Sequence, residues 1–149
     1  MGYISENLMK NEVITYRGCL HWVIYAPAVA FGVLTLVFAA LKFPILAAIC
    51  LLLAAWGVLA AWMRQHTTEF AVTNKRVIGK TGFIKRDTID LNLAKVESLY
   101  ADQGVWGRMF SYGAVRIVGT GGSNFIVKGA LNPVAFKRAA NEQIDAAQS

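Results

Sequence analysis

Two uninterrupted hydrophobic runs, Trp22–Leu41 and Pro44–Met63, follow one another near the start of the chain. Neither run contains an acidic or basic side chain, and only Lys42 and Phe43 separate them. A helix of about 20 apolar residues spans a hydrocarbon core of roughly 30 Å, and it satisfies its own backbone hydrogen bonds there, which a pair of strands does not. The sequence therefore predicts an antiparallel pair of transmembrane helices over residues 22–63.

The residues at the ends of these runs distinguish a membrane hairpin from the buried helical hairpin of a soluble protein. Core helices of this length usually keep a polar face. Trp22 and Tyr25 lie at one end of the first run, and Trp62 and Arg64 lie at the matching end of the second. Aromatic and basic residues gather in this way where a helix leaves the bilayer, so we favour the membrane hairpin.

Basic residues near the ends of the two runs predict their orientation. Only one basic residue, Lys42, lies on the side of the membrane where the first run ends and the second begins. The side shared by both termini carries Lys10, Arg17, Arg64, Lys75, Arg76 and Lys80. Because an excess of Lys and Arg stays in the cytoplasm, we expect a multi-pass protein of the cell membrane with both termini cytoplasmic.

The charge is concentrated in the C-terminal part of the chain. The net charge is +6; residues 1–21 are neutral, and residues 64–149 hold twelve basic and seven acidic side chains. This division predicts a short cytoplasmic arm (1–21), the hairpin (22–63) and one small cytoplasmic domain (64–149). A basic domain beside an anionic leaflet is attracted to it, so membrane lipids are expected partners. Nucleic acid is not, because no basic tract is interleaved with aromatic residues.

After Arg64 the hydrophobic pattern changes from continuous to alternating, which is typical of strands. The predicted strands are 68–72, 75–80, 83–93, 96–101, 114–119 and 124–128. Asn132 suits the N-cap of a final helix and Pro133 suits its first position. We therefore predict an α+β membrane protein in which a bent antiparallel sheet is closed at one end by an amphipathic C-terminal helix.

Several segments, in this order after the two hydrophobic runs, are similar to one known family. They are 68–78 (TEFAVTNKRVI), 93–98 (LAKVES), 102–104 (DQG), 107–113 (GRMFSYG) and 115–122 (VRIVGTGG), with His21 and Trp22 before the first run. In combination they resemble the bacterial pleckstrin-homology-like (PH-like) membrane proteins. The resemblance implies a PH-like fold, which is a bent, nearly closed antiparallel β-barrel capped by a C-terminal helix, and a bacterial inner-membrane location. It implies no known activity, and residues 10–12 depart from the Pro-Gly-Glu turn that the family tends to have.

No group of residues in the sequence indicates catalysis or a cofactor. Both histidines lie beside the hydrophobic runs, and no Ser or Cys has an evident base partner. Asp87 and Asp90 lie three residues apart in a predicted strand, hence on opposite faces, and are interpreted as surface charge. Gly79-Lys80-Thr81 lacks the earlier glycine that a phosphate-binding loop needs. We predict that the protein is not an enzyme and holds no cofactor.

Cys19, His21 and His66 form the one set with metal-binding chemistry. The hairpin brings the start of the first helix beside the end of the second, and thiol and imidazole groups are the ligands of zinc. Histidines that flank membrane helices are common, however, so we expect no metal site. Cys19 and Cys50 should lie at different depths in a reducing compartment, so we also expect no disulfide.

The densest basic cluster spans two predicted hairpins and consists of Lys75, Arg76, Lys80, Lys85 and Arg86. If the hairpin ends converge toward the membrane, these side chains can hold an anionic headgroup by charge-assisted hydrogen bonds. The turn at Thr73-Asn74 is much shorter than the loop that forms a phosphoinositide pocket in lipid-binding PH domains. The cluster is therefore a lipid-binding candidate through loose electrostatic contact or a specific headgroup site.

The segment 105–110 places large apolar side chains between glycines, where a loop is expected. One interpretation is a short helical turn that plugs the barrel. The other is an exposed patch of the kind that marks a partner or membrane surface, with Trp106, Arg108, Met109 and Phe110 as partner-binding residues. Exposed strand edges offer a second chain a further place to pair.

These patterns predict an inner-membrane-anchored binding or assembly module that self-associates or scaffolds other membrane proteins. Small residues let helices pack closely, and the two runs contain Ala28, Ala30, Gly32, Ala54, Ala55 and Gly57. Two alternatives stay open: a sensor of anionic lipid that uses the basic hairpins, and a subunit of a lipid-acting membrane enzyme.

Overall fold

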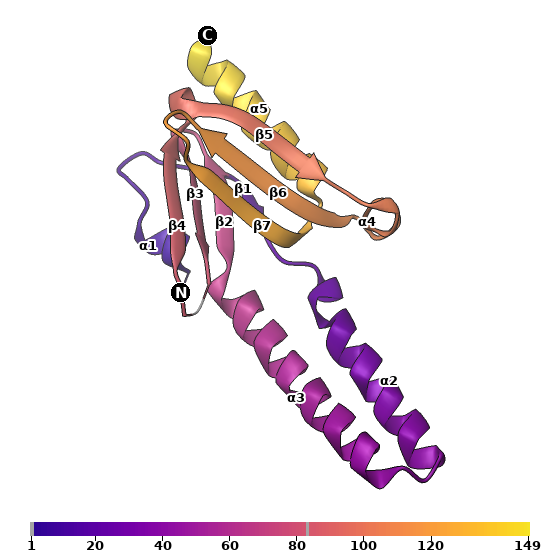
Figure 1. Cartoon of the computed structure of the whole chain (residues 1–149). Helices are drawn as coiled ribbons and strands as arrows, with labels where there is room; N and C mark the ends of the chain where they lie inside the picture. The colour runs from indigo at the N-terminus through magenta and orange to yellow at the C-terminus, as the bar shows by residue number, and fades with distance from the viewer. Residues whose placement is uncertain (1, 83) are drawn as a thin grey trace. The chain divides into compact units, whose positions relative to one another are not determined.

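The computed structural model describes residues 2–82 and 84–149. They form two compact units: a sheet unit, Met1–His21 with Thr67–Ser149, and a helical unit, Trp22–His66. The chain begins in the sheet unit, leaves it after His21 and returns at Thr67 (Figure 1). Residues 1–21, for which the sequence predicts a separate arm, are grouped with the sheet unit.

The helical unit contains a short 3₁₀ helix, η1 (Trp22–Tyr25), and two long helices, α2 (Ala26–Ala40) and α3 (Pro44–Thr67). Trp22–Ala40 and Pro44–Thr67 are long and apolar enough to cross a membrane. Lys42 turns the chain between them in a left-handed backbone conformation, with φ 60°. Pro44 begins α3 as predicted, at a position where its missing N–H costs no hydrogen bond.

Small side chains bring α2 and α3 together. Ala28 and Ala54 are buried, and a Cβ added to Gly57 would lie 3.1 Å from the Cβ of Ala28. Gly32 differs, because no described neighbour lies within 4 Å of the place where its Cβ would be. Part of the small-residue set predicted to support self-association therefore packs inside the hairpin.

The first sheet has the strand order β1-β2-β3-β4, with all neighbours antiparallel. Its strands are β1 (Ile14–Gly18), β2 (Glu69–Thr73), β3 (Arg76–Thr81) and β4 (Asp87–Asn92). β1 is missing from the predicted strands, because the whole helical unit is inserted between it and its partner β2. The predicted strand over 83–93 begins only at Asp87, since the chain turns at Gly82 with φ 91°; Phe83 lies outside the described residues.

The second sheet has the order β5-β6-β7 and is also antiparallel. Its strands are β5 (Val96–Asp102), β6 (Tyr112–Gly119) and β7 (Asn124–Leu131), with the 3₁₀ helix η2 (Leu93–Lys95) before β5 and the helix α4 (Val105–Phe110) before β6. Gly121 and Gly122 make the tight β6–β7 turn with φ 89° and 85°. A bridge between Leu20 and Ala130 joins the stretch after β1 to β7.

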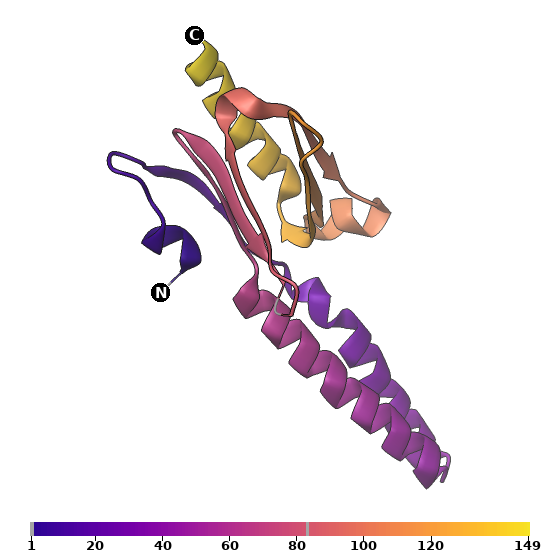
Figure 2. The ribbon, with the colours of Figure 1, turned by 60° about the vertical axis from the view of Figure 1, so that its left-hand side comes forward.

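The C-terminal helix α5 (Pro133–Gln148) packs against strands of both sheets (Figure 2). Phe136 is fully buried, and its ring centroid lies 5.9 Å from that of Tyr16 and 5.1 Å from that of Phe70. Asn132 occupies the N-cap position and Pro133 follows it, as predicted, but Asn132 has a left-handed conformation and its side chain makes no capping hydrogen bond. Two long apolar helices and antiparallel sheets packed on a C-terminal helix confirm the predicted α+β class.

The outer face of the first sheet is covered by the start of the chain. The helix α1 (Tyr3–Glu6) contacts β2 and β3, and Ile4, Ala71 and Ile78 form a small buried cluster there. β2 and β3 are therefore buried on both faces, which is why their sequences alternate poorly.

Candidate binding groove

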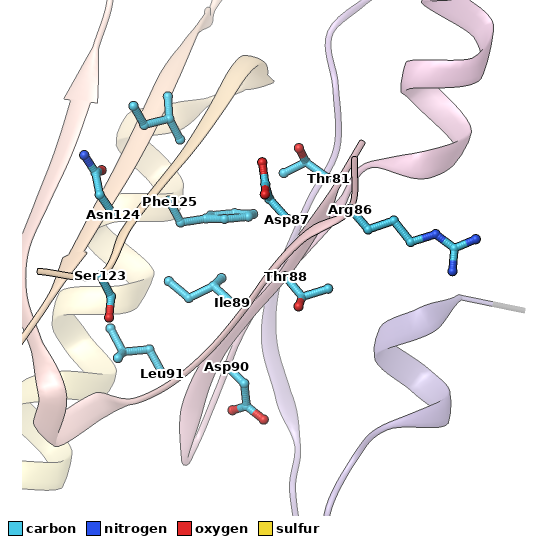
Figure 3. Close-up of a pocket in the computed structure, with 11 residues that line it drawn as sticks. Thr81, Arg86, Asp87, Thr88, Ile89, Asp90, Leu91, Ser123, Asn124 and Phe125 are labelled. Atoms are coloured by element: carbon cyan, nitrogen blue, oxygen red, sulfur yellow. The ribbon is translucent and has the colours of Figure 1, made fainter. Parts of the chain in front are cut away.

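A groove of about 700 Å³ opens between β4 and the start of β7 (Figure 3). One wall comes from Thr81 and residues 86–91, and the other from residues 123–126. In the order of the described strands, β4 is an outer strand of its sheet. The groove therefore runs along a strand edge.

The floor of the groove is apolar. Ile89 and Leu91 alternate along β4 and are buried, as is Phe125 of β7. Two glycines make room for these side chains: a Cβ on Gly79 would lie 2.7 Å from Cε1 of Phe125, and one on Gly119 would lie 2.7 Å from Cδ2 of Leu91. Because both glycines lack a side chain, Phe125 and Leu91 fill the space between the two sheets.

The rim of the groove is polar. Asp87 lies on the same side of β4 as Ile89 and Leu91, whereas the side chain of Thr88 extends to the other side (Figure 3). Ser123 and Asn124 lie on the opposite wall. An apolar floor with a few polar groups at the rim is typical of a binding site.

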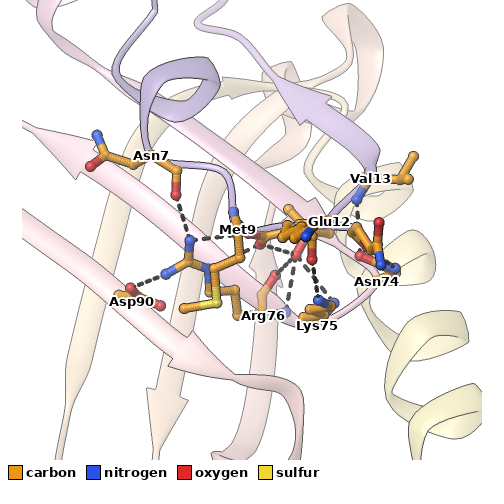
Figure 4. A network of polar contacts seen from close by, with 11 residues as sticks. Asn7, Met9, Glu12, Val13, Asn74, Lys75, Arg76 and Asp90 are labelled. Carbon is orange, nitrogen blue, oxygen red and sulfur yellow. Dashed lines mark hydrogen bonds and ion pairs between the residues drawn. The ribbon is translucent and has the colours of Figure 1, made fainter.

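On the outer face of the same sheet, Glu12, Arg76 and Asp90 form an ion network (Figure 4). Nε and Nη2 of Arg76 donate to the two carboxylate oxygens of Glu12, at 2.9 and 3.1 Å. Nη1 donates to Asp90, and Nη2 also donates to the carbonyl oxygen of Asn7 at 2.6 Å. The hydroxyl of Thr73 donates to Glu12 at 2.7 Å. The network ties residues 7–12 to β2, β3 and β4.

The side chain of Glu12 has no exposed surface, yet it is charged at neutral pH. Burial alone would raise its pKa, but hydrogen bonds from Arg76, from the N–H of Met9 (2.6 Å) and from Thr73 outweigh burial and lower the pKa from 4.5 to about 2. The hydrogen bond to Glu12 in turn raises the pKa of Arg76. The pair is therefore a permanent ion pair across the neutral range.

The lowered pKa of Glu12 predicts a loss of stability in acid. The folded state favours the carboxylate, so its stabilisation is complete above pH 4.5 and is lost as the pH falls toward 2. The shift corresponds to about 3 kcal/mol, and less than roughly half of that remains at pH 3. We expect urea unfolding of the full chain in detergent micelles to show this loss, and Glu12→Gln to lack it. An equal loss in both proteins would contradict the assignment.

Comparison with known families identifies the family of the chain. Residues 24–145 match the family described as Bacterial PH domain. The chain belongs to this family. The match confirms the resemblance seen in the sequence; it extends from the first apolar helix to α5 and leaves β1 outside. No curated protein and no solved structure matches the chain.

In this bacterial PH domain protein, the five predicted lipid-binding residues do not form one cluster. Lys75 and Arg76 lie at the β2–β3 turn, while Lys80, Lys85 and Arg86 lie at or beyond the other end of β3, roughly 17 Å away along the strand. Arg76 is bound in the ion network and its side chain is only 9 % exposed. It is therefore removed from the predicted headgroup site, because its guanidinium is already occupied by two carboxylates. Lys75 donates to the carbonyl oxygen of Lys10 at 2.8 Å.

The predicted partner-binding segment forms α4, and it does not plug the space between the sheets. Val105, Trp106 and Met109 are 80 %, 65 % and 67 % exposed, and Phe110 and Arg108 are exposed as well. The Trp106 and Phe110 rings stack with their centroids 6.3 Å apart. Of the two interpretations, the exposed patch is the one that the structure supports.

The packing of the α4 backbone explains why the large side chains of this helix point outward. Gly107 is its buried residue, and a Cβ there would lie 2.5 Å from the carbonyl oxygen of Tyr112. Nε2 of Gln103 donates to the carbonyl oxygens of both Gly107 and Tyr112, at 3.2 Å each. Ser111 then ends the helix with φ 58°. The backbone of α4 packs inward, and its large side chains point out.

The three residues with metal-binding chemistry, Cys19, His21 and His66, are divided between the two units. His21 is buried in the sheet unit. Its backbone N–H donates to the carbonyl oxygen of Gly129 at 2.8 Å, and its ring centroid lies 5.4 Å from that of Tyr112. Cys19 is exposed in the same unit, whereas His66 belongs to the helical unit. Among residues 2–82 and 84–149, no group of three or more His, Cys, Asp or Glu side chains is placed to hold a metal.

Sequence reasoning missed the groove and the role of Glu12. The alternation of Ile89 and Leu91 marks them as inward-facing, but nothing local to β4 indicates that Phe125 lies against them. Glu12 precedes β1, and the partner of β1, the strand β2, follows the whole helical unit in the sequence. In both cases the missing information is which distant segments pack together.

Proposed function

We propose that this protein is a membrane-anchored binding and assembly module of the bacterial inner membrane, with both termini in the cytoplasm. The two long apolar helices and the family support the anchor. The observation that carries the binding role is the groove along β4, with its apolar floor and polar rim. Its occupant in this proposal is an extended segment of protein chain.

An extended segment suits the groove for a physical reason. An outer strand offers backbone N–H and C=O groups to its surroundings, and a peptide adds to such an edge as a further strand. Alternate side chains of that peptide would then face Ile89, Leu91 and Phe125, while Asp87 at the rim would favour a basic residue in it.

A second copy of the chain is the occupant in this proposal. Residues 64–149 carry a net charge of +5, and Asp87 lies on the rim of the groove. A basic side chain of the second copy gains electrostatic complementarity with Asp87, and an acidic one gains it with Arg86. Anchoring in one membrane plane also raises the effective concentration of copies for one another.

The test is the mass of the intact protein in native lipid, measured by native mass spectrometry. We expect wild-type protein to form a homo-oligomer, and Asn124→Trp, which places a large ring in the groove, to weaken it by about tenfold or more. The matched control is Asn141→Trp on the exposed face of α5, which should keep the oligomer. A monomeric wild type, or an Asn124→Trp oligomer as stable as wild type, would refute assembly through the groove.

A further inference from the structure

The two points where the chain leaves and rejoins the sheet unit lie at one end of it. Gly18 of β1 is paired with Phe70 of β2. His21, the last residue before the helical unit, is three residues beyond Gly18, and Thr67, the first residue after it, is three residues before Phe70. In an antiparallel pair, going forward along β1 and going backward along β2 lead to the same end of the sheet. His21 and Thr67 therefore lie at one end of the sheet unit, here called the tether end.

The helix α4 lies at the tether end. The ring of His21 lies 5.4 Å from that of Tyr112, the first residue of β6, and the backbone of His21 is bonded to Gly129 of the neighbouring strand β7. Only Ser111 separates α4 from Tyr112. The end of α4 therefore lies close to His21, the last residue that precedes the hydrophobic segment.

A second exposed apolar residue lies at the same end. Glu69, close to the return point Thr67, is paired with Lys80, and the β3–β4 turn begins just beyond, after Thr81. Ile84 in this turn is 97 % exposed, and Lys85 and Arg86 follow it. The turn thus presents a large apolar group and two cations next to the return point.

We infer that the tether end is itself a lipid-contacting surface: α4 and the β3–β4 turn enter the boundary between headgroups and acyl chains. This inference rests on the proposed membrane anchor and shares only Arg86 with the groove. Trp106, Phe110, Met109 and Val105 supply the apolar contact, with Ile84 as a second point. Arg108, Lys85 and Arg86 lie among the headgroups, where their charge is favourable beside anionic lipid.

The chemistry of these residues fits a bilayer boundary. Aromatic rings and basic side chains are the residues that gather there, with rings at headgroup level and cations toward phosphate. A domain tethered by two chain segments at one end keeps that end at the surface, so burial of these side chains requires no diffusion from solution. Exposed apolar groups of this size in water cost free energy that lipid contact removes.

The experiment measures tryptophan depth in the full chain, reconstituted in vesicles of phosphatidylcholine and anionic phosphatidylglycerol. Brominated phosphatidylcholine quenches a nearby indole, with bromine either near the headgroup or near the end of the acyl chain. Trp106 becomes the single reporter when phenylalanine replaces Trp22, Trp56 and Trp62. A chain that keeps only Trp56, in the middle of α3, reports on the anchor.

The matched control places the reporter at the opposite end of the sheet unit. Val13 is exposed there, and its N–H donates to Asn74 in the β2–β3 turn at 3.0 Å. Val13→Trp, in a chain whose four tryptophans are phenylalanine, puts the indole roughly 25 Å from His21 along β1. If the triple replacement fails to fold, a nitroxide on Met109→Cys, with Cys19 and Cys50 replaced by alanine, reads the same depth with all tryptophans kept.

We expect shallow bromine to remove roughly half or more of the Trp106 emission, deep bromine to act mainly on Trp56, and neither to affect Val13→Trp. Red-shifted, unquenched Trp106 emission beside a quenched Trp56 would overturn the inference and leave the anchor standing. Blue-shifted but unquenched Trp106 emission would also overturn it, in favour of a protein contact at α4. If Trp56 too is unquenched, the membrane anchor itself fails.

Discussion

Replacing Arg76 with methionine lowers the free energy of unfolding of the sheet unit by about 3–5 kcal/mol. The change removes the cation that faces the fully buried carboxylate of Glu12 and leaves that charge without its partner in a region that excludes water. It also breaks the hydrogen bond to the carbonyl oxygen of Asn7, so residues 3–12 lose their attachment to the sheet. The measurement is urea unfolding of the full chain in detergent micelles, followed by near-ultraviolet circular dichroism.

The matched control for this prediction is Arg116→Met. Arg116 also pairs with a carboxylate, that of Asp102 at 3.9 Å, but both side chains are largely exposed. Exposed pairs contribute about 0–1 kcal/mol, so this variant should unfold nearly as wild type does. If Arg76→Met and Arg116→Met lose the same small amount, the buried network does not hold the start of the chain in place.

Phe136→Ala is expected to cost about 3–5 kcal/mol of the same free energy of unfolding. Phe136 has no exposed surface, and its ring is the contact through which α5 packs against Tyr16 of β1 and Phe70 of β2. Truncation leaves a cavity at the junction of both segments that flank the helical unit. The same urea titration measures the loss, and limited proteolysis should show earlier cleavage near the start of the chain.

Val134→Ala is the control on the same helix. Val134 lies two residues before Phe136 on α5 and is exposed, so its truncation should cost less than about 1 kcal/mol. Comparable losses in the two variants would mean that α5 does not pack on the sheets through Phe136.

Local patterns were sufficient for the elements whose partners are close in the chain. The two apolar helices, the β2–β3 hairpin at Thr73-Asn74 and the final helix after Pro133 each depend on residues within one segment. Periodicity and turn chemistry act over such short distances. The same local patterns, together with the five short segments, indicated the bacterial PH domain family.

The first strand could not be predicted from its own residues. Ile14–Gly18 is short, and its partner β2 lies beyond the whole helical unit. The burial of Glu12 depends on Arg76 of β3, which is distant in sequence. The residues next to Glu12 in the sequence therefore indicate only an exposed arm. Arg76 in turn reads as a surface cation until its two carboxylate partners are known.

The sequence by itself determined the two long apolar helices, the antiparallel strands after them and the family, because hydrophobic period and turn residues are properties of contiguous segments. Only the tertiary structure decided which charged residues are buried, which apolar residues are exposed and where a groove opens. Those depend on contacts between distant segments: Arg76 on Glu12, Phe125 on Gly79, and Tyr112 on His21. A side chain's exposure is set by what packs over it, and for Glu12 and His21 the covering residues come from the far side of an inserted helical hairpin.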